Sequence, residues 1–311
     1  MIVDVPTADD FNASGTDFLN IAWGMIVDLS LDLEGQQELW IGDDDLVTDD
    51  YWKAAQRPLA TALSLVQQGT EFLLKGHIAT VSPYLLLSGD PSSWPSKCHE
   101  RNVRFSEFKT IEAQDLIRAY NTVKDQHKRL PPEFQTRYEQ LRSKRNTIMH
   151  SVDPNLRIQP KDLLIEILEI CHYLIAPKTW IKTRKDFIDK APPSLINDLE
   201  PILGDFFLEI DHVIRLLQPA ELDKYFGFNK KQRRYICPDC YREVADYFED
   251  TMPKFALLQP NEPTSTSLYC FVCNKVIDVS REDCRSENCP GNVISVKGLR
   301  LCLTCVSYQD T

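Results

Sequence analysis

The segment RNTIMH, residues 145–150, brings together three side chains that could act on a phosphodiester. Arg145 keeps its charge and offers a planar fork that matches two phosphate oxygens. His150 can serve as base or acid near neutral pH, because the ordinary pKa of histidine is about 6.5. Asn146 could orient the imidazole or donate a hydrogen bond to the phosphate. These roles suit metal-independent RNA cleavage, which needs a base for the 2'-hydroxyl, a cation for the phosphorane and an acid for the leaving 5'-oxygen.

A helix from about 133 to 149 is expected to carry this segment, with two prolines at its start and the sequence SVDP after it. At about 3.6 residues per turn, Asn146 and His150 share one face, with Arg142 one turn earlier and Arg145 beside it. A structural explanation also exists. Cations near a helix C-terminus complement the helix dipole, and a protonated histidine there does the same.

Eight cysteines after Arg234 form a second set of residues that could do chemistry. They are Cys237, Cys240, Cys270, Cys273, Cys284, Cys289, Cys302 and Cys305. Three CxxC pairs and the looser CRSENC predict two structural zinc ions per chain, each bound by four thiolates. Sequential pairing would join the first two pairs in one site and the last two in another. Spacing alone leaves a crossed pairing open.

The segment NKKQRRY places four cations beside aromatic residues just before the first cysteine pair. Such a segment suits phosphate contact together with base stacking, although a solvated linker would look the same. The predicted RNA-binding residues are Arg142, Lys144, Lys230, Lys231, Arg233 and Arg234.

The formal net charge of −11 does not argue against an RNA ligand, because it is local. Residues 1–60 hold thirteen acidic and two basic residues, and the other 251 residues are balanced. The acidic stretch GDDDLVTDDYW is expected to be a solvated loop leading into a helix; a decoy for nucleic acid or a partner-binding loop is the alternative. No segment approaches the roughly 20 uncharged residues that cross a bilayer, and the start lacks a secretion signal, so a cytoplasmic protein without membrane contact is expected.

Helical patterning dominates the chain to about residue 228. Apolar spacing predicts two antiparallel helices, one in FLNIAWGMIVDLSLDLE and one over 50–75. A loop over 92–104 should precede a helix over 106–130, and further helices follow the motif. We therefore expect a helical domain over 1–228, with its core at about 15–176 and extra helices at 177–228. A small β-rich zinc-ribbon domain over 229–311 should follow, in which NVISVKGLRLC forms a hairpin.

The order EFLLKGHIATVSPYLLL, insertion, LRSKRNTIMHS and final apolar helix resembles the HEPN superfamily of helical bundles. That family's signature is an Arg, often followed by a polar residue, with a His after four to six intervening residues. The resemblance covers roughly residues 15–176 and places Arg145, Asn146 and His150 in the catalytic positions. One subgroup has a modified Tyr two residues after the His. Val152 stands there, which puts that mode of regulation in doubt.

This resemblance implies a metal-independent endoribonuclease of phage defence or toxin-antitoxin growth control. It also implies a homodimer through the helical bundle, in which two motifs form one composite cleft, with an antitoxin or sensor protein as a further partner. The alternative is a non-catalytic HEPN module that dimerises or holds a nucleotide while the zinc ribbons recruit nucleic acid or protein.

Overall fold

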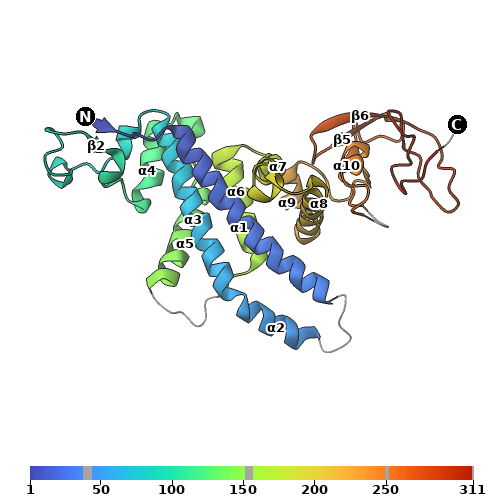
Figure 1. Cartoon of the computed structure of the whole chain (residues 1–311), viewed down its shortest axis with the longest axis horizontal. Helices are drawn as coiled ribbons and strands as arrows, with labels where there is room; N and C mark the ends of the chain where they lie inside the picture. Colours follow the sequence, from blue (N-terminus) through green and yellow to red (C-terminus); the bar gives the residue numbers. More distant parts are fainter. Residues whose placement is uncertain (38–43, 151–156, 249–251, 310–311) are drawn as a thin grey trace. The chain divides into compact units, whose positions relative to one another are not determined.

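The computed structural model describes residues 1–37, 44–150, 157–248 and 252–309. The chain divides into two compact units, Met1–Ala176 and Pro177–Thr311. The protein is mainly helical with a small strand-rich C-terminal region, as predicted (Figure 1). Within the described residues, no helix combines the length and apolarity needed to cross a bilayer.

Two long antiparallel helices, α1 (Ala8–Gln37) and α3 (Gln56–Ala79), form the centre of the first unit (Figure 1). They approach closely where glycines face each other, because a Cβ on Gly69 would lie 2.8 Å from the carbonyl oxygen of Gly15. This pair confirms the two predicted antiparallel helices, although α3 begins at Gln56 and not at residue 50, because α2 ends at Ala54. Helix α2 (Asp44–Ala54) takes up most of the acidic stretch predicted as a loop.

Three further helices pack in this unit: α4 (Ala113–Val123), α5 (Pro132–His150) and α6 (Pro160–Ile170). The end of α6 continues into a π-helical turn over Cys171–Ile175. Helix α5 spans the predicted range.

The helix predicted over 106–130 is much shorter, because long-range contacts hold the chain before it in an irregular conformation. Strand β1 (Ile2–Val3) pairs with β2 (Val103–Arg104), and a 3₁₀ turn over Phe105–Glu107 follows. The backbone then runs beside the segment after α3. The Ser88 N–H donates to the carbonyl oxygen of Lys109 at 2.8 Å, and helical geometry begins only at α4.

Helix α5 buries only its first half. Phe134, Tyr138 and Leu141 recur at helical spacing and are each less than 5% exposed. The Tyr138 hydroxyl also donates to the carbonyl oxygen of Ala113 at 2.8 Å, which fixes α5 against the start of α4. None of the later α5 residues is buried, so the motif lies on the accessible half of the helix.

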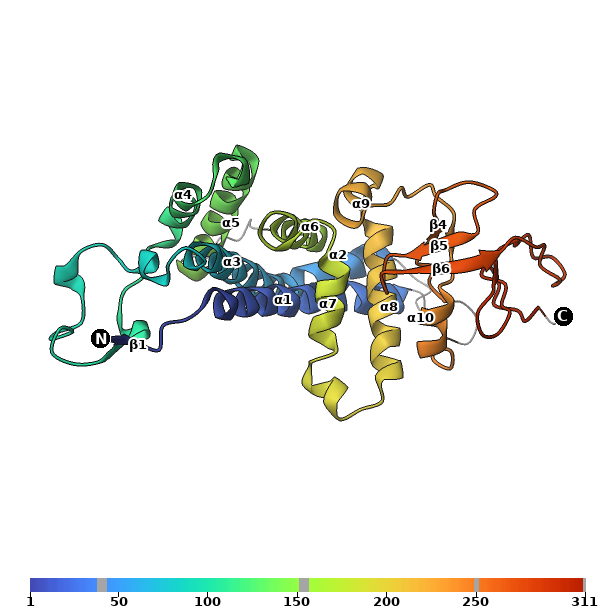
Figure 2. The same ribbon diagram turned by 90° about the horizontal axis from the view of Figure 1, so that it is seen from above.

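The second unit combines helices with one antiparallel sheet in the order β3-β4-β5-β6-β7. Figure 2 shows the three central strands, β4, β5 and β6, side by side. Its helices are α7 (Trp180–Ile188), α8 (Leu199–Leu216), α9 (Pro219–Phe226) and α10 (Pro238–Glu243). Its strands are β3 (Arg234–Tyr235), β4 (Ala256–Leu258), β5 (Ser267–Cys270), β6 (Lys275–Ser280) and β7 (Ile294–Ser295).

The helices over 177–228 thus lie in the same unit as the cysteine-rich region, whereas the sequence grouped them with the helical domain. Aromatic packing explains the difference. The Phe207 ring of α8 lies 5.4 Å from Phe255, and Phe228 stacks on Phe271 at 4.6 Å between ring centroids. Apolar surface on these helices is buried by the sheet, and this burial is the main favourable term in packing.

Candidate functional site

The first group of cysteines lies where two tight turns meet. Cys237 precedes α10 and accepts a hydrogen bond from the N–H of Cys240 at 3.5 Å. Cys270 ends β5, and Cys273 lies in the turn to β6. Sγ atoms of the two pairs approach to 3.7 Å between Cys237 and Cys273 and to 3.8 Å between Cys240 and Cys270.

The second group joins the looser CRSENC segment to the final CxxC pair. The Cys284 and Cys305 Sγ atoms lie 3.7 Å apart, and those of Cys289 and Cys302 lie 3.9 Å apart. Gly291 makes room for the group, because a Cβ there would lie 2.7 Å from the Cys302 Sγ. The pairing is therefore sequential, which the spacing alone had left open.

Both groups fit a tetrahedral metal ion. All four sulfur atoms of each group lie within 4.8 Å of one another. An ion with bonds of about 2.3 Å to four thiolates sets them about 3.8 Å apart. Hydrogen bonding among the thiols, with Cys237 the largest contributor, raises the pKa of Cys240 and Cys270 and lowers that of Cys273. A cation would allow all four to be thiolates at once, so each group can hold one structural metal ion.

In the first unit, three predicted residues line one cavity of about 440 Å³: Arg142, Arg145 and Asn146 of α5. The cavity lies between α5, α3 and the segment before α4. Arg145 Nη1 donates to the Asn146 Oδ1 at 3.3 Å, so the two motif side chains contact each other. Arg142 is paired with Glu139, which accepts from its Nη2 at 2.7 Å.

His150 is the last residue of α5; it is exposed and is not among the residues that line this cavity. The neighbouring Met149 is 56% exposed. A single chain therefore brings Arg145 and Asn146 together and leaves His150 open to a ligand or a partner. Val152, together with the predicted helix stop after His150, falls outside the described residues.

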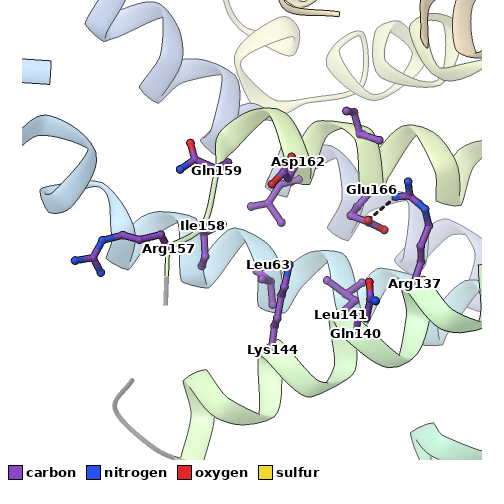
Figure 3. Close-up of a pocket in the computed structure, with 12 residues that line it drawn as sticks. Leu63, Arg137, Gln140, Leu141, Lys144, Arg157, Ile158, Gln159, Asp162 and Glu166 are labelled. Carbon is purple, nitrogen blue, oxygen red and sulfur yellow. Dashed lines mark hydrogen bonds and ion pairs between the residues drawn. The ribbon is translucent and has the colours of Figure 1, made fainter. Parts of the chain in front are cut away.

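Lys144 lies on another side of α5, where it lines a second cavity of about 310 Å³ (Figure 3). Leu141 and Arg137 of α5 and Asp162 and Glu166 of α6 also line it. Arg137 is held to Glu166 by a contact of 2.6 Å. Burial raises the pKa of Glu166 although the Arg137 charge opposes this shift. Lys144 is thus separated from the cavity that Arg142 and Arg145 line.

Three of the four cations before the first cysteine pair make contacts within the protein. Lys230 Nζ donates to the carbonyl oxygen of Leu217 at 2.7 Å and so caps the end of α8. Arg234 lies 3.9 Å from Asp211 of α8. Arg233 lies over the Tyr235 ring, 5.3 Å from its centroid, so this cation contacts an aromatic face within the protein. Lys231 is exposed.

The predicted site residues do not include the part of the cavity lining that lies outside α5. This part consists of Gln67, Glu71 and Lys75 of α3 and Lys109, Thr110, Ile111, Glu112, Ala113 and Gln114. A signal was present in α3, where Gln67, Glu71 and Lys75 recur every four positions and so share one face of the helix. No comparable local signal marks Lys109, which reaches the cavity through the long-range backbone contacts after β2.

The fold and sites define a mainly helical protein with two four-cysteine groups that can each hold a metal ion and a cationic cavity beside an RNxxxH helix. Comparison with protein-family models, curated proteins and solved structures gives no match. The resemblance to the HEPN superfamily, drawn from the motif and the order of helices, therefore stays a prediction.

Proposed function

We propose that this protein is a metal-independent endoribonuclease of HEPN type, with Arg145, Asn146 and His150 as its catalytic set. The observation that carries the proposal is their position on the accessible half of α5, with Arg145 and Asn146 lining a cavity rich in cations. A role in phage defence or growth control, in the cytoplasm, belongs to the same proposal.

The roles follow from the chemistry of the side chains. Arg145 stabilises the charge that develops on the phosphorane, and Asn146, which accepts a hydrogen bond from Arg145, holds the guanidinium in place. His150 transfers a proton as base or acid. Cleavage proceeds by attack of the 2'-hydroxyl on phosphorus and expulsion of the 5'-oxygen, which yields a 2',3'-cyclic phosphate and a 5'-hydroxyl. DNA has no 2'-hydroxyl and would not be cut.

A homodimer supplies what one chain lacks. In-line cleavage benefits from a base and an acid on opposite sides of the phosphate, and each chain offers one motif histidine. A two-fold axis beside the end of α5 would bring both His150 side chains to one cleft and cover the exposed Met149.

The position of His150 supports a second candidate, a non-catalytic module that binds RNA or a nucleotide. His150 does not line the cavity that Arg145 and Asn146 line, so one chain can hold an anion without a proton donor beside it. In this case the strand-rich region would recruit nucleic acid or protein.

Zinc is the proposed ion at both four-cysteine groups. Zn²⁺ favours four thiolates in a tetrahedron, and a complete thiolate shell leaves no position for water or substrate. The ions would then stabilise the fold of the second unit and take no part in RNA cleavage.

Cleavage is tested by incubating purified protein with total RNA in a chelator and sequencing the fragment ends. His150→Ala and Arg145→Ala should each abolish cleavage, since loss of a proton-transfer group costs roughly 10²- to 10⁴-fold. His127→Ala is the matched control, because His127 is exposed in the same unit and lies outside the motif. Cleavage retained by a clean His150→Ala preparation would overturn this catalytic assignment, and absence of cleavage by the wild type would favour the binding module.

A further inference from the structure

The lining of the cavity beside α5 carries both cationic side chains and hydrogen-bond acceptors. Lys75, Lys109, Arg142 and Arg145 contribute four positive charges, against the two carboxylates of Glu71 and Glu112. Among the described residues that line it, only Ile111 and Ala113 contribute apolar side chains, and none is aromatic. Such a lining suits an anion with hydroxyl groups better than a flat base, which requires an apolar or aromatic surface.

Gln67 provides an independent sign of a ligand. Its side chain is only 1% exposed and lines the cavity, yet its Oε1 accepts no hydrogen bond from the described residues. The Nε2 donates to the Glu71 Oε1 at 3.2 Å, which fixes the orientation of the amide, because a flipped Gln67 would place two acceptors against each other. Buried acceptors are nearly always satisfied, so a bound molecule that donates a hydrogen bond would suit this position.

The cations differ in how firmly the protein already holds them. Lys109 Nζ lies 2.8 Å from Glu112, but both side chains are more than half exposed. Lys75 makes a long hydrogen bond of 3.5 Å to the Thr110 hydroxyl. Exposed or long contacts of this kind contribute little stability, so a phosphate can replace these partners at low cost.

We propose that this cavity binds a ribose phosphate group, with Gln67 accepting a hydrogen bond from a ribose hydroxyl and Lys75 and Lys109 contacting the phosphate. The group could belong to an RNA chain or to a free ribonucleotide. The RNA source rests on the proposed ribonuclease function, in which the bound unit would lie next to the phosphate that Arg145 contacts. Gln67, Lys75 and Lys109 are then positioning residues for the substrate.

Binding is measured on full-length His150→Ala protein, which the proposed mechanism makes unable to cleave. The probes are a fluorescent 12-nucleotide single-stranded RNA, the DNA of the same sequence, AMP and 2'-deoxy-AMP. Lys75→Gln and Lys109→Gln should each weaken binding of the ribose probe roughly fivefold and lower the salt dependence of RNA binding by about 0.7 in slope. Lys128→Gln, an exposed cation of the same unit outside the cavity, is the matched control and should change neither.

Gln67→Met tests the hydroxyl contact, because it keeps the side-chain length and removes the acceptor. This variant should lose most of the preference for ribose over deoxyribose while its melting temperature stays near that of the parent. Binding of RNA without binding of AMP would show that the ribose phosphate group belongs to an RNA chain. Binding of AMP without binding of RNA would show that it belongs to a free nucleotide. The proposal is overturned if Lys75→Gln and Lys109→Gln bind both ribose probes as Lys128→Gln does. The separate cleavage assay tests the proposed ribonuclease function, so either proposal can fail while the other stands.

Discussion

The Sγ atoms of Cys237 and Cys273 lie 3.7 Å apart although the residues are separated by 36 positions in the chain. That distance matches the edge of a thiolate tetrahedron around a zinc-sized ion, about 3.8 Å. The contact joins the turn before α10 to the turn after β5, so a metal ion there would fix two parts of the sheet region to each other.

Two zinc ions per chain should therefore copurify with the protein. Cys237→Ser and Cys302→Ser should each reduce the zinc content from two ions to about one, because each removes one ligand from a different group. The strand-rich region should become sensitive to protease, while the far-ultraviolet helical signal largely survives. Elemental analysis and limited proteolysis check these outcomes.

Cys98→Ser is the matched control for the metal prediction, since Cys98 lies outside both groups. It should retain two ions. Protein purified without oxygen that holds no zinc would remove the assignment of the ion, and loss of both ions from Cys237→Ser would show that the two centres depend on each other.

Catalysis should belong to a pair of chains. Differently tagged wild-type and His150→Ala, Arg145→Ala chains can be coexpressed and the mixed dimer isolated. If each cleft needs residues of both chains, the mixed dimer should fall far below half of the wild-type rate, by roughly 10²-fold. Activity is compared per dimer in single-turnover assays. A fully active monomer in sedimentation would contradict the composite cleft.

The stability of the first unit should fall as the pH drops below about 6.5. Burial lowers the pKa of His77. The hydrogen bond to Leu174 opposes this shift, and the charge of Lys124 adds to it. That bond, 2.8 Å from Nε2 to the carbonyl oxygen, places a proton on Nε2 of the neutral ring. As the pH falls, His77 takes up its second ring proton at a higher pH in the unfolded chain than in the folded protein. Stability is therefore lost from about pH 6.5 down towards the lower pKa of the folded state.

Denaturant melts of wild type and His77→Gln between pH 7.5 and 5 check this dependence. Both proteins share their other titrating groups, so His77→Gln should lose less stability on acidification. His127→Gln, with an exposed side chain, should follow the wild type. Parallel curves for His77→Gln and wild type would show that His77 does not contribute.

Variants of Lys230 and Lys231 should distinguish a structural role for Lys230 from an RNA-binding role for Lys231. Lys230→Ala removes the hydrogen bonds from its Nζ to Leu217 and Arg215, so the free energy of unfolding should drop by about 1 kcal/mol. Lys231→Ala, an exposed neighbour, should leave stability unchanged. Thermal melts measure the stability of both variants, and an RNA-binding assay tests the RNA-binding role predicted for Lys231. Equal stability of the two variants would contradict the capping role.

Several features followed from the sequence because their causes are local. Helix α5 has its predicted range, since apolar residues three and four positions apart select a helix wherever it packs. Arg145 and Asn146 are neighbours on that helix, and their side chains meet. The CxxC pairs likewise set two thiols close together through tight turns, so groups of cysteines able to hold a metal ion could be predicted from spacing.

Tertiary structure alone decided which distant residues meet. The cysteine pairing, the shared cavity of Lys109 and Arg145 and the contact of Lys230 with the end of α8 all join segments that are separated in the chain. Residues 177–228 joined the second unit for the same reason, since the sheet region offered aromatic surface for Phe207 to bury. Helical spacing shows that a residue such as Phe207 will be buried, but the partner is set by the packing of the whole core, where shape and volume must match.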